Sequence, residues 1–95
     1  MAPRSLDSIL RLRLYIAGRS PNSVLAESNL RAVCAAHFAA GHELEIVDLL
    51  QNSELAARDR VIVTPTLVKM SPAPTQRLIG NLSDHQLVFS TLAAE

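Results

Sequence analysis

Hydrophobic and polar residues alternate along residues 9–17, the first patterned segment of the chain. Leucine and isoleucine occupy every second position from Leu10 to Ile16, with two arginines and Tyr15 between them. A period of two is typical of a β-strand that buries one face. The next residues, 18–22, include glycine and proline, which interrupt a strand. A first strand over residues 9–17 is therefore predicted.

The following segment, residues 23–41, changes to the helical period. Its apolar residues recur at spacings of three and four, from Val24 through Leu30 to Phe38, which predicts a helix of about four turns. Asn22 or Ser23 is suited to cap its start, because either side chain can accept a backbone N–H. Gly41 stands where a left-handed C-terminal cap would fall.

The rest of the chain predicts three more strands and two more helices. These are a strand at 43–50, a helix at 53–60 capped by Ser53, a strand at 61–70, a strand at 76–82, and a helix at 85–95 capped by Ser83 or Asp84. The order β-α-β-α-β-β-α makes the first strand pair parallel with a right-handed crossover, and the last strand pair an antiparallel hairpin. We therefore expect a single α/β domain of the thioredoxin-like type over residues 1–95.

Thr64–Pro65 interrupts the predicted strand at 61–70. Proline lacks a backbone N–H, so it removes a hydrogen bond from a sheet and is normally confined to an edge or a bulge. From the residues alone, an ordinary proline bend explains it equally well. In thioredoxin-type domains a Thr-Pro pair precedes the third strand with the proline in cis, so the same is expected of Pro65.

Composition narrows the class of partner and the compartment. The chain has 9 basic and 9 acidic residues, and a net charge of zero argues against nucleic-acid binding, which needs a basic face. No segment approaches the about 18–20 apolar residues that cross a membrane, and the N-terminus lacks the pattern of a signal peptide. Cys34 is the only cysteine, which excludes an internal disulfide and fits a reducing cytoplasm. We expect a cytoplasmic protein without membrane or nucleic-acid contacts.

Catalytic motifs are absent from the sequence. Thioredoxin enzymes carry Cys-x-x-Cys after the first strand, but residues 19–23 read Arg-Ser-Pro-Asn-Ser. Cys34 falls on the apolar face of the predicted helix, which favours a structural thiol over a redox thiol. His37, His42 and His85 do not have a metal-ligand spacing and are expected to be solvated or to cap helices. We expect no enzyme activity, no metal and no cofactor.

Several motifs occur together in register: YIAG, PNS, VDLLQN, TPTLVK and IGNLS. From about Leu12 to Leu92 the chain resembles the KaiB family of bacterial clock proteins. The resemblance implies a non-enzymatic protein that binds the first ATPase ring of the hexameric clock ATPase KaiC. It also implies two folds: a ground state that is usually tetrameric, and a monomeric thioredoxin-like state that binds KaiC. The second half, from about Ser53 onward, rearranges between them.

Local propensity favours the thioredoxin-like state for this chain. The family's ground state would place helix within residues 60–70, which the β-branched residues at 61–64 oppose. Better-known members carry Gly and Asp near Thr91 and Ala93, so this chain has the stronger C-terminal helix. The residues expected to set the preference between the folds are Pro65, Pro72, Pro74, Thr91 and Ala93.

The resemblance also suggests a partner-binding surface. Arg60, Lys69 and Arg77 keep a positive charge and are expected to pair with carboxylates of the ATPase ring, with Asn22 and Pro72 shaping nearby loops. The alternative is that these charges are merely solvated, since an isolated exposed pair contributes only about 0–1 kcal/mol. Tyr15 is expected either to anchor a partner or to cover the sheet beneath a helix.

The chain also departs from the family pattern. Leu25 and Glu45 replace residues that are often basic, and the acidic C-terminal tail of many members is missing. These differences suggest a divergent paralogue and leave binding to the third clock protein, KaiA, in question. Two other functions stay open: a thioredoxin-like module like that of a clock-associated sensor kinase, which would compete for the ring, and a redox or chaperone-like stress protein without a clock role.

Overall fold

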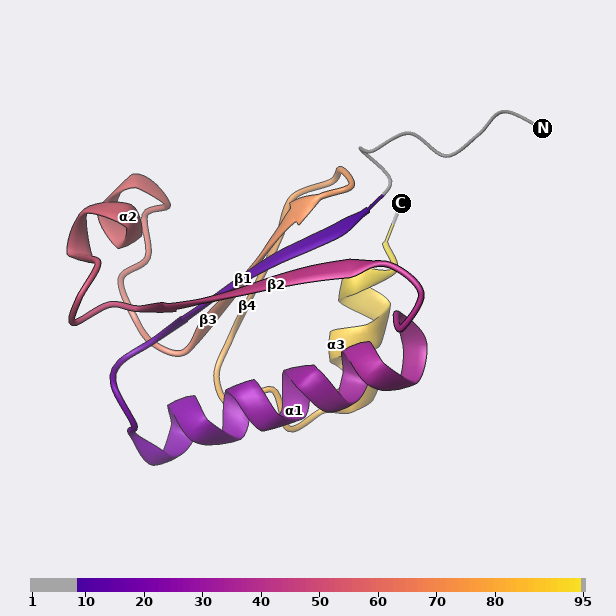
Figure 1. Cartoon of the computed structure of the whole chain (residues 1–95), viewed down its shortest axis with the longest axis horizontal. Helices are drawn as coiled ribbons and strands as arrows, with labels where there is room; N and C mark the ends of the chain where they lie inside the picture. The colour runs from indigo at the N-terminus through magenta and orange to yellow at the C-terminus, as the bar shows by residue number, and fades with distance from the viewer. Residues whose placement is uncertain (1–8, 95) are drawn as a thin grey trace.

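The computed structural model of the chain describes residues 9–94. Its elements follow the predicted order: β1 (Leu10–Ile16), α1 (Pro21–His37), β2 (His42–Asp48), α2 (Ser53–Arg58), β3 (Thr66–Ser71), β4 (Gln76–Ile79) and α3 (His85–Leu92). The strands form one sheet in the order β2-β1-β3-β4 (Figure 1). β1 is parallel to β2 and antiparallel to β3, and β3 is antiparallel to β4. This is the expected thioredoxin-like fold. Residues 1–8 and Glu95 lie outside the described residues, and the last helix, predicted to run to 95, ends at Leu92.

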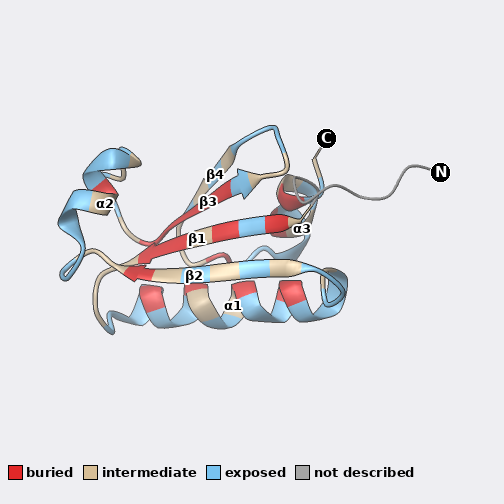
Figure 2. Cartoon of the chain, turned by 45° about the horizontal axis from the view of Figure 1, so that its top comes forward, coloured by how far each residue is buried: buried red, intermediate tan, exposed pale blue. Residues whose placement is uncertain are grey.

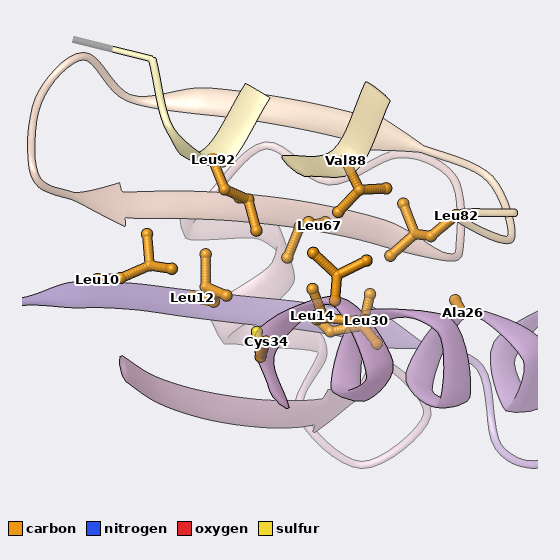
Figure 3. Close-up of a cluster of buried hydrophobic side chains, with 11 residues drawn as sticks. Leu10, Leu12, Leu14, Ala26, Leu30, Cys34, Leu67, Leu82, Val88 and Leu92 are labelled. Carbon is orange, nitrogen blue, oxygen red and sulfur yellow. The ribbon is translucent and has the colours of Figure 1, made fainter. Parts of the chain in front are cut away.

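The larger hydrophobic core lies between the sheet and the two helices α1 and α3. Successive strand residues point to opposite faces, so alternate positions of β1 turn toward these helices. The buried side chains of this core are Leu10, Leu12, Leu14, Ala26, Leu30, Val33, Cys34, Leu67, Leu82, Val88 and Leu92 (Figure 3). The buried positions of α1 form a stripe along the side that faces the sheet (Figure 2). Cys34 is part of this core, which confirms its structural position, and burial raises the pKa of its thiol.

A smaller cluster covers the other face of the sheet, beneath α2. It consists of Tyr15, Val47, Ala56 and Val68. Tyr15 is 0% exposed, so it covers the sheet beneath a helix, and the prediction of a partner-facing aromatic anchor is wrong.

Both ends of α1 differ from the prediction. The N-cap is Ser20, with Pro21 in the first helical turn, where the missing N–H of proline costs nothing. Ser23 is buried instead, and its Oγ accepts the N–H of Ala17 at 3.1 Å. The helix ends at His37, and the N–H of its C-cap, Phe38, bonds to the carbonyl of Cys34. Gly41 is therefore not the C-terminal cap.

The prediction for the last helix holds at its start. The side chain of Asp84 accepts the N–H of Leu87 at 3.0 Å, as an N-cap should. In α2 the N-cap is Asn52 instead of Ser53, and the side chain of Asn52 makes no capping bond.

The prediction of a strand at 61–63 is wrong, because α2 ends in a tight reversal. Arg60 has a left-handed backbone with φ 57°. The N–H of Arg60 bonds to the carbonyl of Ala57, and the N–H of Val61 bonds to that of Ala56. This paired pattern is the Schellman motif, in which Arg60 occupies the position that glycine usually takes. Residues 61–65 then run irregularly to β3, which begins at Thr66.

Three peptide bonds in the second half are cis: Thr64–Pro65, Ser71–Pro72 and Ala73–Pro74. The expectation of a cis Pro65 directly before β3 is confirmed. Pro65 is buried, whereas Pro74 is exposed in the turn between β3 and β4.

Candidate partner-binding surface

The structure brings together two of the predicted partner-binding residues, Arg60 and Arg77. The guanidinium of Arg77, on β4, donates to the carbonyl of Arg60 at 3.2 Å and to the carbonyl of Asp59. Both carbonyls belong to the turn that ends α2, where backbone carbonyls lack helical partners and attract cations. Among residues 9–94, neither arginine forms an ion pair with a carboxylate. Both arginines are exposed.

An exposed isoleucine lies two residues after each of these arginines. Ile62 is 90% exposed and Ile79, on β4, is 69% exposed. Ile79 pairs with Thr66 on β3, and the hydroxyl of Thr66 donates to the carbonyl of Val63 at 2.6 Å. We call Arg60, Ile62, Val63, Arg77 and Ile79 the α2–β4 surface. Arginines beside exposed apolar groups are typical of protein interfaces.

A polar cluster lies directly behind this surface. The hydroxyl of Tyr15 donates to the Asp59 carboxylate at 2.5 Å and lies 3.1 Å from the Leu55 carbonyl. The guanidinium of Arg13 donates to Asp59 at 3.0 Å and to Glu45 at 2.8 Å. The cluster therefore connects β2, β1 and the end of α2.

Hydrogen bonds within the polar cluster stabilise the ionised form of Asp59 and the protonated form of Tyr15. Partial burial by itself raises the pKa of Asp59, but hydrogen bonds from Tyr15 and Arg13 outweigh burial and hold that pKa below its ordinary value. Burial, and next the hydrogen bond to Asp59, raise the pKa of Tyr15. At neutral pH the cluster thus contains an ionised carboxylate and a protonated phenol.

Lys69 is not part of the surface, which corrects its predicted role. It is 1% exposed, and its Nζ donates to the Ala94 carbonyl at 2.9 Å, just beyond α3. Lys69 lies two residues after Leu67 on β3 and so shares its face, which α3 covers. A carboxylate on a partner does not reach this amine in the thioredoxin-like fold.

The other predicted residues are placed elsewhere. Asn22 is exposed in the first turn of α1, which covers the opposite face of the sheet, and Pro72 is half-buried just after β3. Thr91 lies in α3, and Ala93 is its C-cap. The influence of Thr91, Ala93 and the three cis prolines on fold preference stays a prediction.

The histidines have local partners. The Nδ1 of His42 is 2.8 Å from the Phe38 carbonyl, and the Nε2 of His85 is 2.9 Å from the Asn29 side-chain oxygen. Across residues 9–94, histidine, cysteine and carboxylate side chains do not gather in a group of three or more that could hold a metal. Within the same residues, α-helices of the length and hydropathy that cross a membrane are absent.

Two features, one of the surface and one of the polar cluster behind it, are not predicted from the sequence. The predicted strand at 61–70 includes Ile62 and gives no sign that its side chain is exposed. Asp59 had no distinguishing signal, because its partner Tyr15 is 44 residues away. Tyr15 and Arg13 fall on the same side of the alternating first strand, and that pairing was the one available indication of a polar contact.

Comparison with known proteins identifies the family. The KaiB domain profile matches residues 13–93. The circadian clock oscillator protein KaiB of Synechococcus elongatus is 43% identical over 78 residues, which are 82% of this chain and 76% of that protein. The KaiB protein of Prochlorococcus marinus is also 43% identical over 78 residues, 82% of this chain and 67% of that protein.

Solved structures agree with the fold. The N-terminal domain of SasA from Synechococcus elongatus has a TM-score of 0.77 at 27% identity, covering 100% of this chain and 93% of that chain. The thioredoxin Deadhead from Drosophila melanogaster has a TM-score of 0.74 at 18% identity, covering 92% and 81%, and shows the fold alone. With the profile matching most of its length and relatives of this identity, the chain belongs to the KaiB family of circadian clock proteins.

Proposed function

We propose that this chain is a non-enzymatic clock protein that binds the first ATPase ring of a KaiC-like hexamer through the α2–β4 surface. The observation that carries the proposal is the hydrogen bond from the Arg77 guanidinium to the Arg60 carbonyl, in a member of the KaiB family whose nearby Ile62 and Ile79 are exposed. The guanidinium groups would pair with carboxylates on the ring, and the isoleucines would bury apolar area. Arginine suits such pairing because its planar donors match a carboxylate.

The described fold is the binding-competent state in this proposal. The chain acts as one domain in the cytoplasm, as a monomer when thioredoxin-like, and its second half can refold into a ground state that forms tetramers. Such a metamorphic chain requires two packings within a few kcal/mol of each other. The likeness to the SasA domain supports competition between the two proteins for one site. Binding to KaiA is the less supported part of the proposal, because Leu25 and Glu45 depart from the family pattern.

Size-exclusion chromatography with light scattering tests this function. The chain is measured alone and with a KaiC-like hexamer and ATP. A monomer that joins the hexamer supports the proposal. A tetramer that binds over hours keeps the partner but reverses the choice of dominant fold. If no available KaiC-like ring forms a complex, the clock-partner function is wrong, and an interaction or chaperone-like role without a clock takes its place.

Charge reversal locates the surface. Arg60→Glu and Arg77→Glu are each expected to weaken ring binding about tenfold or more, because they place a carboxylate against carboxylates. Arg19→Glu is the matched control, since Arg19 is exposed and precedes α1. Equal loss in all three variants would mean that only net charge matters.

A further inference from the structure

We propose that Asp59 is the positioning residue of the α2–β4 surface: its ionised carboxylate, held by Tyr15 and Arg13, fixes the turn that carries Arg60 and whose backbone carbonyls bind Arg77. The contacts that fix the turn stand on their own, and their effect on ring binding rests on the proposed function. Three elements meet at Asp59, since Tyr15 and Arg13 come from β1, Arg77 comes from β4, and Asp59 itself is the C-cap of α2.

The first step is that α2 needs an external anchor. It has six residues, of which only Ala56 is buried. A helix this short is not stable by itself in water, and tertiary contacts must hold it. From β1, the polar contacts that hold its last turn are those of Tyr15 to Leu55 and Asp59, and that of Arg13 to Asp59.

The second step is that the same turn forms the surface. Asp59 precedes Arg60, whose left-handed backbone reverses the chain toward Ile62. Arg77 then donates to the carbonyls of Asp59 and Arg60. If the Asp59 side chain is released, both carbonyls lose their fixed place, and the two arginines lose their common support.

The third step is that the anchor depends on charge. The groups that face the Asp59 carboxylate are Arg13 and Tyr15 directly, Arg77 nearby on β4, and Glu45, which reaches it through Arg13. Tyr15 and Arg13 donate hydrogen bonds to the ionised carboxylate and so favour the charged form. Because the pKa of Asp59 in the folded chain is below its ordinary value of 3.8, the anchor is complete above that value and is lost as the pH falls through the folded pKa.

Amide hydrogen exchange on the isolated chain tests the positioning role without any partner. The probes are the N–H groups of Asp59, Arg60 and Val61, which bond to the last carbonyls of α2. Asp59→Asn keeps the shape but removes the charge, and we expect exchange at these probes to accelerate about tenfold or more. Glu54→Gln is the matched control, because Glu54 is an exposed carboxylate in the first turn of α2.

Two additions keep the test decisive. Amides of β1 report whether Asp59→Asn still folds, and Tyr15→Phe gives a milder loss of the same contact. In the unmodified chain, exchange at the probes, corrected for intrinsic rates, should accelerate as the pH falls through the lowered pKa of Asp59, and Asp59→Asn should lack this step. Unchanged exchange in Asp59→Asn, or the same pH step in that variant, overturns the positioning role.

Ring binding then separates the two proposals. If the unmodified chain binds the ring, Asp59→Asn should bind about tenfold more weakly although both arginines are present. If Asp59→Asn exchanges faster but binds the ring as tightly as the unmodified chain, Asp59 does not position the α2–β4 surface for binding. If the unmodified chain does not bind, the proposed function fails, and the exchange result alone decides whether Asp59 fixes the turn.

Discussion

The guanidinium of Arg77 closes the C-terminal turn of α2 by donating to the backbone carbonyls of Asp59 and Arg60. An edge strand and a short helix are thereby joined through a single side chain. Because the contact uses two donors of one planar group, its geometry depends on arginine itself as well as on positive charge.

Arg77→Lys should therefore lower the free energy of unfolding by about 1 kcal/mol, although it keeps the charge. Urea unfolding followed by circular dichroism measures the difference. Arg31→Lys is the control, because Arg31 pairs with Glu27 on the surface of α1, where a pair contributes about 0.3–0.5 kcal/mol. If Arg77→Lys and the unmodified chain were equally stable, the two carbonyls would not depend on the two planar donors of the guanidinium.

Arg60→Gly should stabilise the chain by about 1 kcal/mol and weaken ring binding. The left-handed backbone at φ 57° is costly for arginine but not for glycine, although glycine gives part of this gain back through the unfolded state. Arg60→Ala removes the same charge and keeps the unfavourable backbone, so thermal unfolding of the two variants isolates the backbone effect. If alanine were as stable as glycine here, the left-handed turn would be absent in solution.

Tyr15 should ionise only above its ordinary pKa of 10.0, because burial and the hydrogen bond to Asp59 raise the pKa of the phenol. The stabilisation linked to this shift is present below pH 10.0 and is lost as the pH rises through the raised value. The sequence has 1 tyrosine and 0 tryptophans, so the ultraviolet absorbance of tyrosinate reports this group alone. In urea, where the chain is unfolded, the pKa of Tyr15 should return to its ordinary value of 10.0. If the folded chain also titrated at that value, the result would contradict the burial of the phenol.

Lys69→Met should fold and bind the ring like the unmodified chain, because the amine of Lys69 is buried under α3 and does not face a partner. Methionine fills a similar space, whereas Lys69→Ala leaves a cavity and should cost about 2 kcal/mol. Titration calorimetry with the ring measures binding. A loss in Lys69→Met comparable to that in Arg60→Glu would mean that Lys69 turns outward in the bound state.

Sequence patterns predicted the parts of the fold that local chemistry decides. Alternation located β1, and the side chain of Asp84 located the start of α3, because each signal lies within a few neighbouring residues. The β-branched residues at 61–63 favour a strand, but the reversal at Arg60 turns this segment away from the sheet. A left-handed arginine has no signature in the sequence, since glycine is the residue expected there.

The candidate site was predictable only in part, for a related reason. Their positive charge indicates Arg60 and Arg77, but the contact between them depends on how α2 meets β4. Lys69 had the same charge but lies on the covered face of β3, and residue type alone does not tell these faces apart. The contact of Tyr15 with Asp59 spans 44 residues and required the three-dimensional fold.

The two faces of the sheet bury hydrophobic clusters of different size. The free energy needed to open the molecule therefore differs between the two sides of the sheet. The larger core draws on α1 and α3, whereas α2 contributes one buried side chain, Ala56, and the partly buried Leu55 to the smaller cluster. Lifting α2 away would expose a few side chains and leave the larger core intact, so this opening costs much less than global unfolding. The turn that carries Arg60 thus belongs to the part of the chain that opens at the lower cost in free energy, whereas Arg77 stays with the sheet on β4.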